Sequence, residues 1–374
     1  MFCLLAWLTA APALAAAEPA RVVFLSPDTS RFWGLVSGFM QAVADDLDVE
    51  LEVVTDQKRH RLSYLQLAEE VLARPDKPEY LVFMCKENVT ARMVALASEA
   101  GVKVFTFNTD VPEETRELLG LPREQVANWI GHLAPDNVGG GKALAQLLGQ
   151  QARQLTGRAP ATAPAMIALT GTLDSSAATD RNLGLLTVVE SQEAALSQLV
   201  HADWSEAEAH KKTRVLLKRY PTATAIWNAS DGMALGAIAA ARSAGLQPGV
   251  DLVVGGIDWE PRALAAIRDG DLAVSLGRHF MGGGLLMLLL HDYHRGADFA
   301  GSSAMLSYQL EPATRSNLAW VERILDPGNW QRVRFDQFSR ALNPDRSREG
   351  QSADALLDAF AAALNDQGAV ARGY

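Results

Sequence analysis

Short runs of β-branched and aromatic residues alternate along most of this chain with longer stretches of helical apolar spacing. This alternation limits the folds that the chain can adopt. The first run, Arg21 to Leu25, precedes helical spacing from Phe32 to Leu47, and the alternation continues to a run at Val102 to Phe107. It begins again at Asp136, a suitable helix N-cap, and continues to Leu276. Alternating strands and helices with short connections form parallel sheets covered by helices. The sequence therefore predicts an α/β fold with two doubly wound parallel-sheet lobes, which suits a length of 374 residues.

The two ends of the chain depart from this pattern. Residues 1–17 contain the apolar run MFCLLAWL followed by small residues that fit a secretory cleavage site. The run is shorter than the roughly 20 residues that span a bilayer, so it predicts a cleaved signal peptide and a periplasmic protein. An apolar tail on a cytosolic protein is the alternative. After Asp326, turn-forming and charged residues increase, and we expect a C-terminal extension that ends in an amphipathic helix over 353–364.

Composition and motif spacing oppose several classes of function. The net charge of −10 is unlike the basic footprint of nucleic-acid-binding proteins. The Gly139–Lys142 segment lacks the spacing of a phosphate-binding loop, and close packing of a helix start explains its glycines. Cys85 lies in an apolar run and predicts a buried strand residue rather than a nucleophile. With no catalytic or metal-ligating set in the sequence, we expect no enzymatic activity, no cofactor and no metal.

Polar and aromatic segments follow six of the predicted strands. These segments are SPDTSRFW, NTD, TGTLDSSAATDR, DW, NASD and DWEP. In open parallel sheets, ligands bind outside the carboxyl ends of the strands. We therefore expect these segments to line one ligand-binding cleft.

The motifs that carry these segments resemble a known family when taken together and in order. SPDTSRFWGLVSGF, DNVGGGK, SSAATDRNLG, NASDGMALGA and GGIDWEP are similar to the ribose-binding branch of the type I periplasmic binding proteins, a sugar ABC transporter substrate-binding family. The resemblance covers about 21–310. The stretch GRHFMGGGLLMLLLHDYHRG and the tail segment FDQFSRALNP further resemble the LuxP-like autoinducer receptors.

The resemblance implies a particular organisation, the periplasmic binding protein-like I fold. Two lobes are joined by three hinge segments, which should fall near 132–135, 278–280 and 308–311. The N-terminal lobe then contains residues 18–133 and 280–308, and the C-terminal lobe contains residues 134–279 and 309–345. Residues 346–374 form a C-terminal tail with the final helix.

The resemblance also implies which side chains contact the ligand. The apolar face of a sugar packs on aromatic rings, and its hydroxyls need fixed hydrogen-bonding groups. The expected rings are Trp33 with Phe32 beside it, Trp204 and Trp259. Asn108 stands where ribose binders carry aspartate, and Ser230 where they carry asparagine, so ribose itself is not the expected ligand. The other oxygen-bearing side chains expected to bond to hydroxyls are Asp28, Ser30, Asp231 and Asp258.

Two arginines carry the sharpest expectation about the ligand. Arg181 matches the pocket arginine of the family, and Arg278 falls on a hinge segment where the autoinducer receptors carry arginine. Two guanidinium groups facing one cleft favour clustered ligand oxygens or a negative charge, as in a borate diester, a carboxylate or a phosphate. The alternative is that each arginine pairs with a neighbouring aspartate and only orients it.

These features predict a monomeric binding module that closes on a small, oxygen-rich, sugar-like ligand, including anionic ones. Its closed form would be recognised by a membrane partner, either an ABC permease or a sensor kinase. A transcription regulator shares the effector fold but needs a DNA-binding motif in front of the first strand. An α/β enzyme needs a catalytic set, which this sequence does not show.

Overall fold

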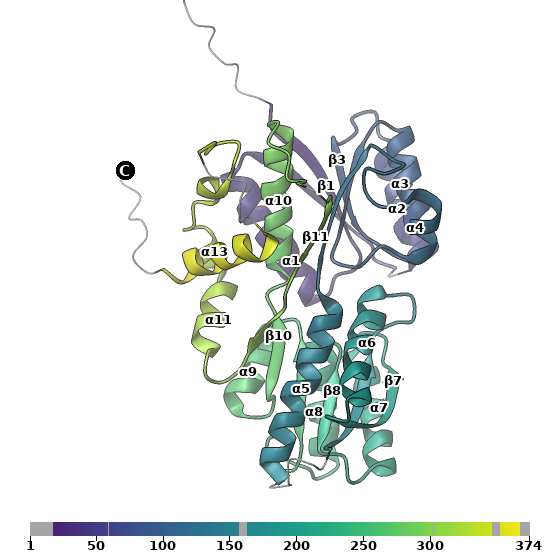
Figure 1. Ribbon diagram of the computed structural model, residues 1–374, viewed down its shortest axis with the longest axis vertical. Helices are drawn as coiled ribbons and strands as arrows, with labels where there is room; N and C mark the ends of the chain where they lie inside the picture. The colour runs from purple at the N-terminus through teal and green to yellow at the C-terminus, as the bar shows by residue number, and fades with distance from the viewer. Residues whose placement is uncertain (1–17, 59, 157–162, 302, 346–351, 367–374) are drawn as a thin grey trace, which may run out of the picture.

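The computed structural model describes residues 18–366, except 59, 157–162, 302 and 346–351. The predicted signal peptide, residues 1–17, and the last segment, 367–374, lie outside the described residues. The described chain forms two lobes, one above the other, with a C-terminal extension along one side (Figure 1). The predicted α/β fold of two sheet lobes is confirmed.

The first lobe contains a parallel sheet whose six described strands run in the order β11-β5-β4-β3-β1-β2. Most of β1 is buried, because helices cover both faces of the sheet. The elements of this lobe are β1 (Ala20–Ser26), α1 (Arg31–Asp46), β2 (Val49–Thr55), α2 (Arg61–Leu72), β3 (Tyr80–Met84), α3 (Thr90–Glu99), β4 (Lys103–Phe107), α4 (Glu113–Leu119), β5 (Trp129–Pro135), α10 (Met281–His294) and β11 (Met305–Tyr308).

The second lobe contains a sheet whose six described strands run in the order β12-β10-β9-β8-β6-β7. The edge strand β12 is antiparallel to β10, so this sheet is not wholly parallel as predicted. The elements of this lobe are α5 (Asn137–Thr156), β6 (Ala165–Thr170), α6 (Ser176–Glu190), β7 (Ala195–His201), α7 (Glu206–Arg219), β8 (Ala225–Asn228), α8 (Asp231–Ser243), β9 (Val253–Ile257), α9 (Pro261–Asp269), β10 (Val274–Gly277) and β12 (Glu311–Ala313).

The chain passes between the lobes at three places. It leaves the first lobe between β5 and α5, returns between β10 and α10, and leaves again between β11 and β12. The second and third crossings fall within the hinge segments that the resemblance implies, whereas residues 132–135 are the last residues of β5 and the first crossing follows them. Each lobe is therefore discontinuous in sequence, and the last crossing carries the chain into the C-terminal extension.

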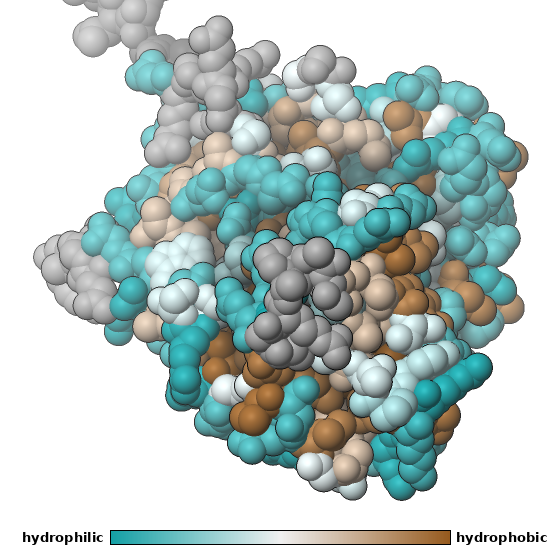
Figure 2. Space-filling model, turned by 60° about the horizontal axis from the view of Figure 1, so that its bottom comes forward, coloured by the Kyte–Doolittle hydropathy of each residue, from teal (hydrophilic) through white to brown (hydrophobic). Residues whose placement is uncertain are grey.

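Helix α10 is buried along nearly its whole length, which explains its run of leucines. Its glycines allow close contact with α1: a Cβ atom at Gly283 would lie 2.6 Å from the Cγ atom of Met40. Among the described residues, no helix is both long and apolar enough to cross a membrane. On the face formed by the end of the second lobe, apolar side chains are interrupted by hydrophilic ones (Figure 2).

The C-terminal extension contacts both lobes. It contains α11 (Leu318–Leu325), α12 (Pro327–Trp330), the short 3₁₀ helix η1 (Phe335–Phe338) and α13 (Ala353–Asn365). The rings of Trp330 and Phe335 lie 5.3 and 5.6 Å from the ring of Phe39 in α1, measured between centroids. The prediction places residues 309–345 in the second lobe, but these aromatic contacts bring the α12–η1 segment onto the first.

Candidate ligand-binding site

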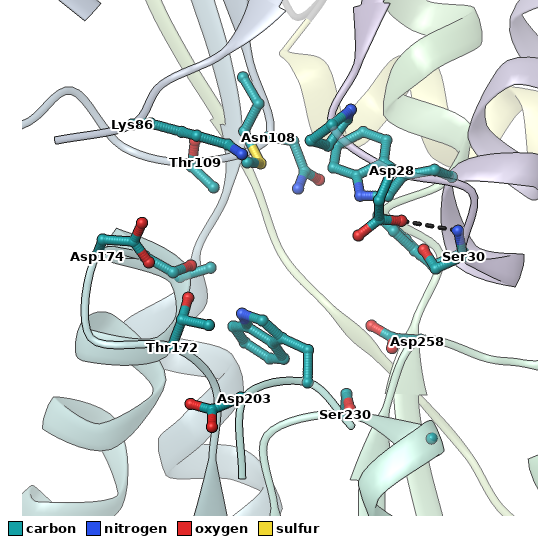
Figure 3. Close-up of a pocket in the computed structure, with 18 of the residues that line it drawn as sticks. Asp28, Ser30, Lys86, Asn108, Thr109, Thr172, Asp174, Asp203, Ser230 and Asp258 are labelled. Atoms are coloured by element: carbon teal, nitrogen blue, oxygen red, sulfur yellow. Dashed lines mark hydrogen bonds between the residues drawn. The ribbon is translucent and has the colours of Figure 1, made fainter. Parts of the chain in front are cut away.

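A cavity of about 310 Å³ lies between the lobes at the carboxyl ends of the strands. Side chains from both lobes point into it (Figure 3). Nine of the twelve predicted contact residues line it: Asp28, Ser30, Phe32, Trp33, Asn108, Arg181, Trp204, Ser230 and Asp258. The six polar segments recognised in the sequence therefore do meet at one cleft. Whether these residues bind a ligand stays a prediction.

The wall from the first lobe is mainly aromatic and neutral. Phe32 and Trp33 begin α1, are 8% and 7% exposed, and pack edge to face with ring centroids 5.1 Å apart. Asn108 follows β4, and its Oδ1 atom is buried without a hydrogen-bond partner among the described residues. An unpaired buried amide oxygen is costly, so this atom is a candidate acceptor for a ligand hydroxyl.

The wall from the second lobe carries a ring and most of the charge. Trp204 follows β7, and its ring lies over Gly171, where a Cβ atom would come within 2.0 Å of Trp204. The guanidinium carbon of Arg181 lies 5.8 Å from the Trp204 ring centroid, within the range of a cation–π contact. The cavity is thus flanked by aromatic side chains of both lobes, as a sugar-like ligand requires.

Arg181 is held rigidly in α6. Its Nε atom donates to Asn137 Oδ1 at 2.9 Å, and its Nη1 atom donates to the Ala229 carbonyl at 2.6 Å. The side chain is 4% exposed. Helix α6 approaches α5 so closely that a Cβ atom at Gly141 would lie 2.0 Å from the Arg181 carbonyl oxygen. The glycines at the start of α5 therefore serve close packing, as predicted, and that packing positions Arg181.

Asp258 is the charged centre of the second wall. His279 Nε2 lies 3.2 Å from Asp258 Oδ1, and Arg181 Nη1 lies 3.9 Å from the same oxygen. Burial raises the pKa of Asp258 to about 7, although the Arg181 charge opposes this shift. Burial and the Arg181 charge hold the pKa of His279 well below its usual range. His279 is therefore neutral at neutral pH, while Asp258 changes protonation state within the physiological range.

Backbone strain collects around the cavity. Asn108, Trp204 and Asp258 have positive φ angles of 70°, 56° and 143°, a region that non-glycine residues rarely adopt. Each follows the carboxyl end of a strand. Strained conformations of this kind persist where the surrounding structure holds them, and they gather at ligand sites.

Two predicted contacts lie behind the cavity wall instead. Trp259 is completely buried, its Nε1 atom donates to the Ser275 carbonyl at 3.2 Å, and its ring packs edge to face on Trp320. The Oδ2 atom of Asp231 accepts from Ser275 Oγ at 2.7 Å and from the Glu260 amide at 2.9 Å. Neither residue lines the cavity. Trp259 lies between the lining residues Asp258 and Glu260 in the turn after β9, where alternate side chains point toward the cleft. Asp231, at the start of α8, braces that turn through its bond to the Glu260 amide.

Arg278 also departs from its predicted position. Its Nη1 atom lies 2.5 Å from Asp358 Oδ1, its Nη2 atom bonds to Asp354, and its Nε atom donates to the Gln309 carbonyl at 3.0 Å. The side chain does not line the cavity. Arg278 therefore pairs with aspartates, which is the alternative to ligand contact raised in the sequence analysis. Its guanidinium faces the acidic side chains of α13, whose position could not be predicted from the sequence.

Comparison with known proteins agrees with this geometry. Residues 22–287 match the family described as a periplasmic binding protein domain. The chain belongs to the periplasmic binding protein family. The structure is similar to that of a periplasmic sugar-binding protein from Pseudomonas fluorescens, with 32% identity, a TM-score of 0.75, and coverage of 87% of this chain and 95% of that one.

More distant relatives share the fold. The ribose import binding protein of Salmonella typhimurium is 25% identical over 238 residues, which cover 64% of this chain and 72% of that protein. The arabinose-binding component of an ABC transporter from Shewanella sp. ANA-3 is 19% identical, with a TM-score of 0.67, and the match covers 87% of this chain and 99% of that chain. The chain is thus a binding protein rather than an enzyme, and its family implies a periplasmic location.

Several residues that line the cavity of this periplasmic binding protein were not singled out as contacts by the sequence reasoning. Three of the charged ones lie inside the six polar segments expected at the cleft, namely Asp174, Asp203 and Glu260. His60, Lys86 and His279 lie outside those segments. His279 follows Arg278 and Glu260 follows Trp259, so adjacency to a residue singled out by the family resemblance was the available signal. Lys86 follows β3 and His60 follows β2, two strands of the first sheet whose carboxyl ends the motif search left out. Among the described residues, no cluster of metal-ligating side chains occurs.

Proposed function

We propose that this protein is a periplasmic solute-binding protein that closes on a neutral sugar and presents it to an ABC transporter. One observation carries the proposal: the cavity between the lobes combines aromatic rings from both lobes with fixed polar groups. Phe32 and Trp33 on one side and Trp204 on the other suit the apolar face of a sugar ring. Asn108 and Asp258 suit its hydroxyls. Relatives that bind ribose or other sugars support the same class of ligand.

The charge of the cavity argues for a neutral ligand over the anionic ones that a pair of arginines would favour. Five carboxyl side chains line it: Asp28, Asp174, Asp203, Asp258 and Glu260. Among the described residues that line the cavity, only Lys86 and Arg181 oppose them with a full positive charge. Two donors of Arg181 are already used by Asn137 and Ala229. A carboxylate or phosphate placed here would meet like charges in a poorly solvated cavity.

A binding screen tests this proposal directly. Purified protein, freed of co-purified ligand by unfolding and refolding, is titrated calorimetrically with pentoses, hexoses, furanose derivatives, myo-inositol and matched sugar acids. We expect micromolar or tighter binding of at least one neutral sugar and weak binding of its acid counterpart. If only sugar acids or phosphorylated sugars bind, the neutral-ligand proposal is wrong.

A receptor role resembling that of the autoinducer receptors is the second candidate. It is supported by the tail that follows Asp326, which adds helices and wraps the first lobe beyond the matched residues 22–287. Autoinducer-2 with borate therefore belongs in the screen. In this role a membrane sensor kinase, rather than a permease, would bind the closed form. A pull-down with each candidate partner, with and without ligand, separates the two roles.

We further propose that the protein acts as a monomer, with a cleaved signal peptide, and does not bind nucleic acid.

A further inference from the structure

Helix α13 connects the two lobes behind the ligand cavity. On the side of the first lobe, the Phe360 ring lies 6.2 Å from the ring of Phe39 in α1 and 5.1 Å from that of Phe335, between centroids. At its C-terminal end, Asn365 Oδ1 accepts a hydrogen bond from Arg323 Nε of α11 at 2.7 Å. Helix α11 packs on α9 of the second lobe, where Glu322 pairs with Arg268. One helix is thus bound to structures that belong to different lobes.

The same helix holds two of the three hinge segments together. Asp354 pairs with Arg278 in the β10–α10 crossing, and its Oδ1 atom accepts from the Gln309 amide in the β11–β12 crossing at 2.8 Å. Asp358 supplies a second carboxylate to Arg278 at 2.5 Å. Arg278 is 3% exposed, so these carboxylates compensate a buried charge.

The residue that α13 holds in this way precedes a cavity residue. Arg278 has a φ of 71°, a left-handed conformation that is costly for a side chain of this type. His279, the next residue, enters the cavity, stacks on Phe32 with ring centroids 4.5 Å apart, and lies 3.2 Å from Asp258. Its Nδ1 atom is buried without a hydrogen-bond partner among the described residues. The side-chain bonds of Arg278 therefore hold the backbone that places His279 against the ligand site.

The position of α13 also relates it to lobe closure. In Figure 1, α13 lies on one side of the hinge segments, whereas α4 and α6 lie on the other. On that other side, Ser176 at the start of α6 donates to the Asp110 carbonyl of the first lobe at 3.4 Å. A rigid rotation that opened the cleft on that side would bring the lobes closer on the opposite side, where α13 packs against α10 and α11.

We propose that α13 is a hinge clamp, in which Asp354 and Asp358 act through Arg278 to position His279 and to favour the lobe arrangement that forms the cavity. These acidic residues then control ligand affinity without contacting the ligand. The inference rests on the proposed function for its ligand, and its effect on lobe arrangement is independent of which ligand binds.

The test compares the D354N/D358N variant with the matched control E322Q. Glu322 lies on the neighbouring helix α11, with a side chain 38% exposed against 35% for Asp354, and it pairs with Arg268 away from the hinge. We expect the double variant to bind the sugar found in the screen on the order of tenfold more weakly, within the usual range of coupling between distinct sites. We expect E322Q to bind within about twofold of wild type, as for an exposed ion pair. D358E keeps a negative charge at position 358, so we expect this variant to bind the sugar nearly as tightly as wild type.

Solution scattering without ligand gives a readout that does not need the sugar. The double variant should have a larger radius of gyration than wild type and E322Q. If the buried guanidinium prevents folding of the double variant, R278M/D354N/D358N removes that charge together with its partners and is measured instead. A folded clamp variant with wild-type affinity and wild-type scattering contradicts the clamp. Failure of every sugar to bind wild type contradicts the proposed function, while a scattering difference would still support the clamp.

Discussion

Arg181 and Arg278 are buried to almost the same extent, 4% and 3% exposed, yet they belong to different parts of the molecule. Arg181 lies in the cavity wall, with its charge near one buried aspartate and one indole ring. Arg278 lies in the hinge and faces two carboxylates of the C-terminal helix. The difference teaches that a buried arginine in this fold is not by itself evidence of a ligand contact. What matters is which acidic groups the rest of the chain brings to it.

The largest expected effect on binding separates these two arginines. Arg181→Ala removes a donor and the charge that opposes the burial of Asp258, so we expect ligand affinity to fall by about 2–4 kcal/mol. The melting temperature should change little, because Asp258 can take up a proton when its counter-charge is lost. Calorimetric titration and thermal unfolding of the same preparation measure both. A large loss of stability with unchanged affinity would assign Arg181 to the scaffold.

A pair of tryptophans extends the comparison. Trp33→Ala should weaken binding by about 1–3 kcal/mol, from lost apolar contact with the ligand. Trp259→Ala, behind the cavity wall, should instead destabilise the second lobe by about 3–5 kcal/mol, as expected for a buried aromatic residue. Denaturant unfolding distinguishes them. If both variants lost affinity and stability to the same extent, Trp33 could not be distinguished as a ligand contact from Trp259 as a structural residue.

The pH dependence of binding tests the charged centre of the second wall. A ligand hydroxyl that donates to ionised Asp258 lowers the raised pKa of that carboxyl, which is about 7 without ligand. The complex then holds fewer protons, so affinity should rise with pH up to about 7 and level off above it. Between pH 7 and pH 6 we expect a loss of about fivefold.

Two variants identify the group responsible. Burial also raises the pKa of Glu260, in the same cavity, to about 7. Titrations of Asp258→Asn and Glu260→Gln at pH 5 to 8 show which carboxyl carries the dependence. Only the first substitution should abolish it. A wild-type affinity that is constant over this range would mean that Asp258 does not accept from the ligand.

The smallest expected effect comes from exchanging arginine for lysine at both positions. A lysine has one ammonium group and cannot reproduce the planar fork of a guanidinium. Arg278 does not line the cavity, and a lysine there retains one carboxylate partner for the buried charge. We therefore expect the loss of affinity to stay below about 1 kcal/mol, less than when both carboxylates are neutralised. At Arg181, where Nε and Nη1 have separate fixed acceptors, the same exchange should cost more. Calorimetric titration of the two variants measures this difference. A larger loss of affinity at Arg278 than at Arg181 would mean that Arg278, and not Arg181, is the more important for ligand binding.

Much of the fold follows from local sequence patterns. The β-branched runs and helical spacing predicted the strands and helices that form the two sheets, within a few residues at their ends. Helix α6 begins at Ser176, inside the polar segment SSAATD, whose lack of apolar spacing gives no sign of a helix start. The short helix α4, at Glu113–Leu119, was missed for the same reason. The antiparallel strand β12 is three residues long and carries no periodic signal.

The sequence by itself determined the fold class and the strand ends that meet at the cleft, because these depend on periodicity and chain order. The three crossings came from the family resemblance and not from periodicity. Only the tertiary structure decided which neighbours in those segments face the cavity. His279 enters it and Arg278 does not, because the acids of α13, about 80 residues away along the chain, hold the Arg278 guanidinium on the far side of the hinge. Pairings between such distant segments leave no local pattern, and they turned an expected ligand contact into part of the hinge.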